Sequence, residues 1–273
     1  MKTVSTAFKY AIVAFIVLIA LIPFYVLLYL ALNAPSSHSF RGLFLVPEFH
    51  FANFAEAWKG SKIDKSIFNS LVITSGAVAL IVLVSSSAGY SIARFRHKAN
   101  ALIFNTLLLC LTIPAIIITV PLYSLMKSIH GINTHWAMIL LMAANAMPLS
   151  VFLYSSFIRT LPKEVEESAI IDGCTYFTAF WRITFHFVRP VTSAVVILTG
   201  LGIWNNYGQA VFFLQKQEMR TVPLAVSMFF QTYGAEWNKM AATALIGLLP
   251  AVAVFLVFQK YFIKGIMAGA LKG

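Results

Sequence analysis

The most polar long stretch of the sequence, residues 164–190, concentrates side chains that are capable of chemistry. It carries acidic residues from Glu164 to Asp172, and His186 is its only histidine. Carboxylates act as general acids and bases when a second titratable group is positioned beside them. The sequence contains neither a G-x-S-x-G nucleophile motif nor an H-E-x-x-H zinc motif. These observations argue against an enzyme and leave the acids to bind a partner or to stabilise local structure.

The order of residues in this stretch predicts two short helices separated by a turn. Pro162 suits a first helical position, acidic residues occupy the opening turns, and Gly173 suits a helix stop. Thr175 is a suitable N-cap for the second, aromatic-rich piece. The small side chains of Ser168 and Ala169 would let another surface approach closely. The pattern is equally compatible with a simple loop whose acids favour a helix N-terminus.

The elements around this stretch must be membrane helices, because the composition is that of a membrane protein. The 273 residues are 60% hydrophobic and only 11% charged, whereas soluble domains carry about 25% charged residues. The chain has 20 Lys and Arg against 9 Asp and Glu. We attribute that excess to attraction by anionic membrane lipid and not to nucleic-acid binding, because no basic run with interleaved aromatic residues lies outside the apolar segments.

Six apolar segments are long enough to cross a bilayer, which takes about 20 residues per helix. We therefore predict an all-α, polytopic membrane protein with six transmembrane helices, forming a single transmembrane domain over residues 1–273. The first segment is too long for the apolar core of a signal peptide and contains Pro23, so we expect it to be retained. The expected spans are 10–32, 67–92, 101–126, 136–158, 191–214 and 240–262.

The distribution of Lys and Arg predicts the orientation. If both termini are cytoplasmic, the inside segments hold more cations than the outside segments, and three of these cations lie in the tight turn from Arg94 to Lys98. Residues 159–190 then form a cytoplasmic loop. The outside loop 33–66 is long enough to meet a soluble binding protein, or it is a plain solvated loop.

The chain lacks the parts needed to use ATP or to hold a cofactor or metal. A phosphate-binding loop ends in Gly-Lys-Ser/Thr, and the dipeptide Gly-Lys does not occur in this sequence. Cys110 and Cys174 lie in different segments and have no metal-ligand neighbours, so we expect two free thiols. Energy must then come from a partner or from an ion gradient. Spans nearly free of ionisable groups count against an ion-gradient-driven secondary transporter, which remains the alternative because backbone carbonyls also bind Na⁺.

The polar stretch resembles a known motif. Glu167-Ser168-Ala169, with Gly173 four residues later, resembles the EAA…G loop of ABC importer permease subunits, and Ile183 follows at the spacing of that family. The segments IWNNYGQAVFFL and RTVPLAV, and the tail FQKYFIKGIMAGALKG, are similar to the carbohydrate branch of these permeases. The resemblance covers most of the chain, and within that branch it is to the smaller of the two membrane subunits.

This resemblance implies a function and a set of partners. The chain would be a transmembrane subunit of an ATP-driven importer of a sugar or oligosaccharide in the bacterial cytoplasmic (inner) membrane. A second homologous permease, an ATPase dimer that binds ATP and Mg²⁺, and an extracytoplasmic solute-binding protein would complete it. The loop 164–190 would be the coupling loop that docks on the ATPase and drives alternating access. The implied docking residues are Glu167, Ser168, Ala169, Asp172, Gly173, Ile183 and Pro190.

Two positions depart from the pattern of the family. Phe185 and His186 replace the usual Leu-Pro after the isoleucine, so the chain leaves the docking loop in a different way, although Pro190 occupies a position where the branch often has a second proline. Asn206 stands where the family often has an acidic residue. The resemblance therefore supports no role for a carboxylate at that position.

Polar residues inside the spans are the candidates for a substrate path. Amides offer hydrogen bonds to sugar hydroxyls, and aromatic rings offer stacking faces. Polar side chains in spans also hydrogen-bond between packed helices, and that interpretation is the stronger one here. The small-residue patch at 85–89 is likewise expected to face another helix. The candidate path residues are Asn145, Trp204, Asn205, Asn206 and Tyr207.

Overall fold

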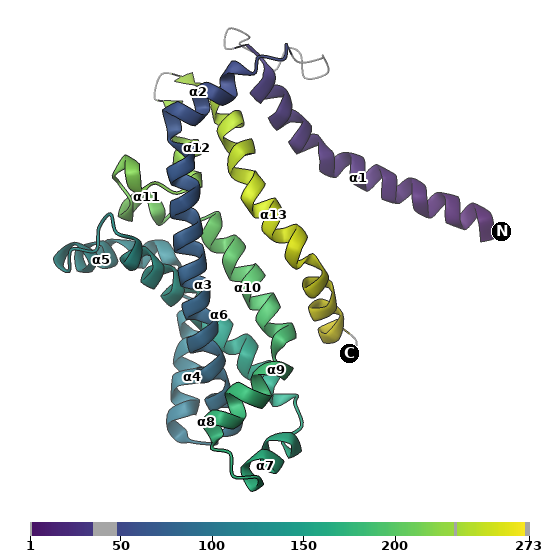
Figure 1. Ribbon diagram of the computed structural model, residues 1–273, viewed down its shortest axis with the longest axis vertical. Coiled ribbons are helices and arrows are strands. Elements are labelled where there is room, and N and C mark those ends of the chain that lie inside the picture. The colour runs from purple at the N-terminus through teal and green to yellow at the C-terminus, as the bar shows by residue number, and fades with distance from the viewer. Residues whose placement is uncertain (1, 35–47, 232–233, 271–273) are drawn as a thin grey trace.

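The computed structural model describes residues 2–34, 48–231 and 234–270, which are mostly helical (Figure 1). The five longest helices are α1 (Lys2–Leu32), α3 (Ile63–Arg94), α6 (His135–Arg159), α10 (Arg189–Trp204) and α13 (Trp237–Ala270). The shorter α-helices are α2 (Ala52–Ser61), α4 (Lys98–Cys110), α5 (Ala115–Ser128), α7 (Glu164–Ile171), α8 (Tyr176–Ala179), α9 (Phe185–Phe187), α11 (Ala210–Phe213) and α12 (Val222–Ser227). The remaining elements are the π-helical turn η2 (Phe180–Thr184), the 3₁₀ turn η3 (Gln217–Met219) and a hairpin of β1 (Phe230–Gln231) and β2 (Gly234–Ala235).

The architecture is that of a polytopic membrane protein built from helices, as the sequence predicts. Four helices, α1, α3, α6 and α13, are by themselves long and apolar enough to cross a membrane. Two further pairs of helices meet that criterion together but are sharply bent, so the number of spans is six if each pair counts as one. The only strands among the described residues are the two-residue partners of the hairpin.

The expected span 101–126 is not one straight helix. The chain forms α4 and α5 instead, which are bent by 105° relative to each other. The break lies between Cys110 and Ala115, and Pro114 is the N-cap of α5 with extended backbone angles. Proline disfavours helical angles in the residue before it and lacks an N–H group, so it interrupts the helical ladder here.

The expected span 191–214 also differs from the structure. Helix α10 starts at Arg189 and stops at Trp204, well before Leu214, and it forms a pair bent by 77° with the helical segment Tyr176–Phe187. The chain turns after Trp204, and the side chain of Asn206 caps the turn that leads into α11, whose own N-cap residue is Gln209. Oδ1 of Asn206 accepts hydrogen bonds from the N–H groups of Gln209 (3.2 Å) and Ala210 (3.3 Å).

Helices α3 and α6 form the centre of the fold and approach closely through small side chains. Ser85, Ser86 and Gly89 are buried on α3. A Cβ atom added to Gly89 would lie 2.6 Å from the Cβ of Tyr154 on α6. The expectation that this patch faces another helix is therefore confirmed. Residues of α10 and the segment before it, including Val188, extend the same buried core.

Helix α1 leaves the bundle at an angle and has an exposed apolar surface (Figure 1). Only its last turns pack inside the molecule, where Ala31 joins a small cluster with α2 and α13. Buried Asn53 joins α2 to the C-terminal end of α1, because its amide donates to the carbonyl oxygens of Ala31 (2.9 Å) and Asn33 (2.7 Å). Part of the expected outside loop, residues 35–47, lies outside the described residues, and its second half contains α2.

The polar stretch and the segment that contains α2 lie at opposite ends of the molecule. Helices α7, α8 and α9 form a projection at one end, beside the turn that joins α3 to α4 (Figure 1). Helix α2 and the end of α1 lie at the other end. We call residues 164–187 the docking knob from here on.

Candidate functional site

The docking knob has the two-helix structure that the sequence predicts. Helix α7 begins at Glu164 and carries its three glutamates in the first turn. Gly173 ends it with a φ of +87°, and the N–H of Cys174 donates to the carbonyl oxygen of Ala169 at 2.9 Å. No atom lies within 4 Å of the place where a Cβ of Gly173 would be. Glycine is therefore suited to this position by its backbone angle and not by a shortage of space.

The second half of the docking knob is an irregular helix rich in aromatic rings. Thr175 caps it as expected, with its Oγ1 accepting a hydrogen bond from the N–H of Thr178 at 3.2 Å. The helix passes through the π-helical turn η2, where Phe180 and Trp181 pack at a centroid distance of 4.9 Å. The knob then continues through α9 to the start of α10 at Arg189.

The seven implied docking residues divide into exposed and enclosed groups. The exposed group is Glu167, Ser168, Asp172 and Gly173. Ala169 is 6% exposed and faces the interior. Ile183 is half-buried and lines a small cavity of about 20 Å³ together with Glu166. Half-buried Pro190 lies in the first turn of α10. The geometry therefore separates residues that are free to meet a partner from residues that shape the knob.

Two residues beside the turn at Gly173 are the most exposed of the large apolar residues described in the docking knob, and sequence reasoning did not select them. Ile171 is 85% exposed and Phe177 is 74% exposed, and the two flank the turn at Gly173. Ala169, two residues before Ile171 on the same helix, is buried instead. The available signal was two large apolar residues on either side of a glycine turn in a polar stretch. It does not reveal which of them point outward.

A buried ion pair joins the docking knob to α3, and sequence reasoning missed it as well. Nε of Arg94 lies 2.9 Å from Oε2 and 3.0 Å from Oε1 of Glu166, and Nη2 lies 2.8 Å from Oε1. The same Nη2 donates to the carbonyl oxygen of Leu161 at 3.2 Å. The side chains of Arg94 and Glu166 are 6% and 11% exposed. A glutamate on the inner face of α7 signals a buried partner, but the sequence does not say which cation it is.

The candidate path residues do not form one cluster. Asn145 of α6 donates from its side-chain amide to Oε1 of Gln209 at 2.8 Å, and Gln209 was not among the candidates. Trp204 is buried against Ile63 and other apolar residues, so its ring is part of the helix packing. Asn206 caps the turn before α11, as described above. The amide–amide bond from α6 to the break after α10 is the kind of interhelical contact that the sequence favoured.

The other two path candidates lie at the same break and are exposed. The side chain of Asn205 donates to the carbonyl oxygen of Leu201 at 3.0 Å, and Tyr207 is 46% exposed. Gln209 is 7% exposed, and its Nε2 is buried without a hydrogen-bond acceptor. Unsatisfied buried donors are uncommon in proteins, so Gln209 is the polar group at this break with unused binding capacity.

An apolar groove runs along the membrane part of the molecule. It has a volume of about 590 Å³ and is bordered by α3, α10 and α13. Leu83 of α3, Leu201 of α10 and Phe255 of α13 are among its lining residues, and each is more than two-fifths exposed. The exposed side chains of α1 are apolar as well, including Leu18. Both surfaces suit contact with lipid or with another membrane helix.

Comparison with known proteins agrees with this architecture. The chain is 40% identical over 253 residues to the melibiose/raffinose/stachyose import permease protein MelC of Bacillus subtilis (strain 168), covering 92% of this chain and 91% of that protein. It is 33% identical over 224 residues to the arabinooligosaccharides transport system permease protein AraQ of the same organism, covering 82% of this chain and 79% of that protein.

A solved structure and a family match support the same conclusion. A chain from a bacterial ABC transporter involved in the import of the acidic polysaccharide alginate has a TM-score of 0.81 to this chain. The two are 15% identical, and the comparison covers 95% of this chain and 97% of that one, so the fold is shared. Residues 81–267 match the family described as binding-protein-dependent transport system inner membrane component. The chain therefore belongs to this family and is a transmembrane permease subunit of an ABC importer.

Proposed function

We propose that this permease subunit imports an oligosaccharide across a bacterial cytoplasmic membrane, with both of its termini on the cytoplasmic side. The chain itself holds no ATP site, and an ATPase dimer that binds ATP and Mg²⁺ supplies the energy. A second homologous permease and an extracytoplasmic solute-binding protein complete the importer. The observation that carries this proposal is the docking knob, an exposed acidic projection with a glycine turn in a chain of this family. Membership of the family sets aside the ion-gradient-driven alternative.

The docking knob is suited to bind a soluble motor. Ile171 and Phe177 present apolar surface on both sides of the turn, and Glu167 and Asp172 present charge beside them. Interfaces commonly draw their affinity from such apolar anchors, while charges at the rim set orientation and the association rate. We assign the anchors and these two carboxylates to the ATPase interface. Ala169, Ile183 and Pro190 support the knob from inside.

The importer works by alternating access in this proposal. ATP binding closes the two ATPase subunits, and the docking knob moves with the subunit that it contacts. The membrane helices then change from an inward-facing to an outward-facing arrangement, and hydrolysis resets them. The chain's own contribution is mechanical and consists of a rigid contact on the cytoplasmic side and helices that respond to its movement.

The second permease subunit meets α1 and the apolar groove in this proposal. Helix α1 reaches away from its own bundle (Figure 1), and none of the residues in its most apolar 18-residue stretch is buried. An apolar helix of the homologous partner would likewise pack into the groove between α3, α10 and α13. Membrane helices associate by close van der Waals contact, which a groove of this kind provides.

The substrate path is assigned to the break after α10. Gln209 and Asn145 carry amides there, and Asn205 and Tyr207 are exposed beside them. A sugar hydroxyl that accepts a hydrogen bond from Nε2 of Gln209 would satisfy a donor that has no acceptor in this state. Trp204 and Asn206 hold the break in shape. The competing role of the Asn145–Gln209 contact is to join two helices.

Reconstitution tests the proposed function. The chain is expressed with the permease, ATPase and binding-protein genes of its own host and purified through a tag on this chain. We expect the second permease and the ATPase to co-purify, and proteoliposomes that contain ATP to take up raffinose or an arabino-oligosaccharide when the binding protein is present. Uptake that needs an ion gradient and no ATP contradicts the proposal. Uptake of neither sugar, with ATP-dependent import of another solute, contradicts the substrate class alone.

A further inference from the structure

The contact between Arg94 and Glu166 is the strongest feature that the proposed function leaves unused. The guanidinium contacts both carboxylate oxygens at 2.8–3.0 Å, and it also reaches the carbonyl oxygen of Leu161. Both side chains are at least about nine-tenths buried. A fork-shaped contact of this kind fixes orientation as well as distance. It therefore restricts how the two elements can turn relative to each other.

The pair joins three elements at the cytoplasmic end of the fold. Arg94 is the last residue of α3, Glu166 lies in the first turn of α7, and Leu161 follows the end of α6. A cation at a helix C-terminus and an anion at a helix N-terminus are each favoured by the helix dipole. The local electrostatics of both helices therefore support the same contact.

Aromatic contacts reinforce the same junction. The ring of Tyr90 on α3 lies 4.8 Å from the ring of Phe180 in η2, measured between centroids. The ring of Phe95, the residue after Arg94, lies 5.0 Å from that of Tyr176 in α8 in an edge-to-face arrangement. The final turn of α3 is thus attached to the first half of the docking knob by the ion pair and to the second half by rings.

We propose that Arg94 and Glu166 are positioning residues that make the docking knob and the cytoplasmic end of α3 one rigid body. A buried ion pair is weak evidence for stability, because desolvation offsets much of the attraction, so a role in fixing geometry explains it better. Helix α3 then follows every movement of the knob. Leu71, Val78 and Leu83 of the same helix border the apolar groove, so the movement reaches the centre of the membrane. This inference rests on the proposed docking function in one respect, namely that the ATPase is what moves the knob.

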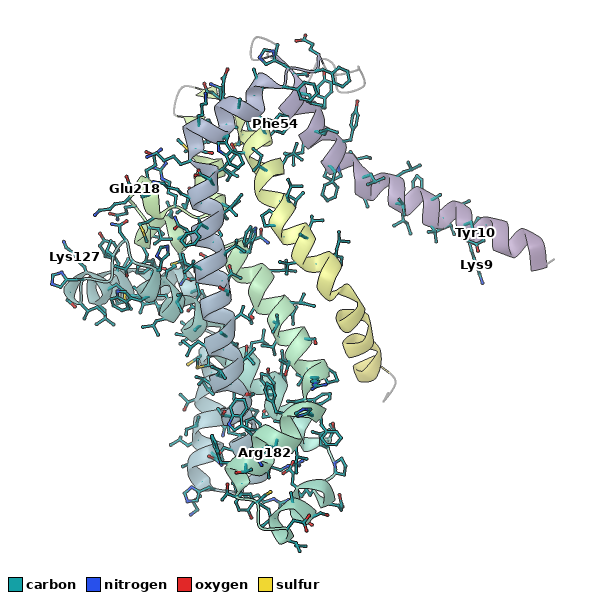
Figure 2. All side chains as sticks on the ribbon, in the orientation of Figure 1. Lys9, Tyr10, Phe54, Lys127, Arg182 and Glu218 are labelled. Carbon is teal, nitrogen blue, oxygen red and sulfur yellow. The ribbon has the colours of Figure 1, made fainter. Side chains whose placement is uncertain are left out.

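A distance measurement across the junction tests the proposal. Spin labels are placed at Arg182 in the docking knob, labelled in Figure 2, and at exposed Val84 on α3, after Cys110 and Cys174 are replaced by serine. The complex is measured without nucleotide and after trapping with ADP and vanadate. We expect one narrow distance distribution that is the same in both states, because the knob and α3 move together.

Variants of the pair supply the decisive comparison. We expect Arg94→Ala and Glu166→Ala to widen the distribution at least about twofold and to make it depend on nucleotide, because removing one partner leaves a buried charge uncompensated. Arg94→Lys should widen the distribution less, because lysine keeps the positive charge and loses only the bidentate contact. The exchange Arg94→Glu with Glu166→Arg should give a narrower distribution than either single reversal. Arg96→Ala, an exposed cation two residues away, is the matched control and should leave it unchanged.

The outcomes separate this proposal from the docking proposal. Distributions as narrow in Arg94→Ala and Glu166→Ala as in the wild type overturn the rigid contact. A variant that lowers the yield of folded protein but keeps the narrow distribution assigns the pair a purely structural role and also overturns it. The widths of the distance distributions measured without nucleotide do not require a bound ATPase. They therefore test the rigid contact even if no ATPase binds. Failure of the wild type to retain an ATPase would count against docking alone.

Discussion

Neighbouring carboxylates of α7 face opposite environments. Glu166 is buried against Arg94, whereas Glu167 is exposed and makes no ion pair among the described residues. On a helix, adjacent residues point about 100° apart, so one of them can face the interior while the other faces solvent. In the docking proposal, the same type of side chain therefore serves two purposes, one inside the subunit and one toward the ATPase.

Reversal of the exposed charge tests docking at the level of one residue. We expect Glu167→Lys to lower the amount of ATPase that co-purifies with this chain by about tenfold, because a rim charge that opposes its partner costs on the order of 1 kcal/mol or more. The control is Glu218→Lys, the same change at an exposed position far from the docking knob (Figure 2). Equal retention of the ATPase by both variants would remove Glu167 from the interface.

The turn at Gly173 gives a graded prediction. A side chain there meets no neighbour, so substitutions differ by how well they tolerate a φ of +87°. The left-handed region costs most residues roughly 1–2 kcal/mol, Asn less, and β-branched residues the most. We expect transport to fall in the order Gly173→Asn, Gly173→Ala, Gly173→Val, with equal amounts of each in the membrane. Full uptake by Gly173→Val would show that the turn is not needed.

The exposed apolar anchors give a matched test of what supplies affinity. We expect Phe177→Ser to weaken retention of the ATPase by at least about tenfold, because an aromatic anchor in an interface typically contributes 2 kcal/mol or more. Phe51→Ser changes a similarly exposed ring near α2, at the opposite end of the fold, and should leave retention unchanged. If Phe177→Ser also has no effect, Phe177 is not an anchor of the interface.

At the level of elements, the contact between α3 and α6 decides whether the fold holds together. Gly89 lies where the backbones approach, and a Cβ there would also lie 3.0 Å from the backbone nitrogen of Ser155. Backbone atoms cannot move aside as a flexible side chain can. Helix α10 offers the contrasting case, because a Cβ at Gly202 would meet nothing within 4 Å.

These two glycines give opposite predictions for the same substitution. We expect Gly89→Ala to lower the stability of the purified subunit by about 1–3 kcal/mol, the usual cost of overpacking. Gly202→Ala should leave it unchanged or raise it by up to about 1 kcal/mol, since alanine favours a helix. Thermal unfolding in one detergent measures both. A higher unfolding temperature for Gly89→Ala than for the wild type would mean that the helices are less closely packed than described.

The breaks in two expected spans are also decided at this level. Pro114 and the run from Asn205 to Gln209 interrupt α4–α5 and the segment after α10. Average hydropathy over a window does not register such a break, because the residues around it stay apolar. Prolines and capping asparagines do indicate the break. They are therefore a better guide than hydropathy to where a span stops.

At the scale of the whole molecule, the exposed apolar surfaces indicate a subunit of a larger complex. A photoreactive amino acid is placed at Leu18 on α1 and, separately, at Leu83 in the apolar groove. We expect both positions to cross-link to the second permease. The cross-linked product should disappear when that permease is left out of the expression. Adducts to lipid alone at both positions would contradict the proposed contact.

Features that depend on residues close together in the chain could be predicted from the sequence alone. The apolar composition indicated a membrane protein, and the turn at Gly173, the cap at Thr175 and the small patch ending at Gly89 followed from neighbouring residues. The expected helix start at Pro162 was two residues early, because α7 begins at Glu164. Each of the local features that were predicted correctly is governed by backbone angles, caps or side-chain size within a few positions of the chain. Local order therefore predicts the docking knob well.

Features that depend on distant partners required the folded chain. Arg94 and Glu166 are 72 positions apart, and Asn145 and Gln209 are 64 apart. The outward direction of Ile171, beside the inward Ala169, likewise depends on where α7 rests. An amphipathic pattern identifies a face that is buried but not what buries it, because many cations and amides in the sequence are chemically equivalent candidates. Only the arrangement of α3, α6 and the docking knob in space selects one of them, through burial and the geometry of the hydrogen bonds.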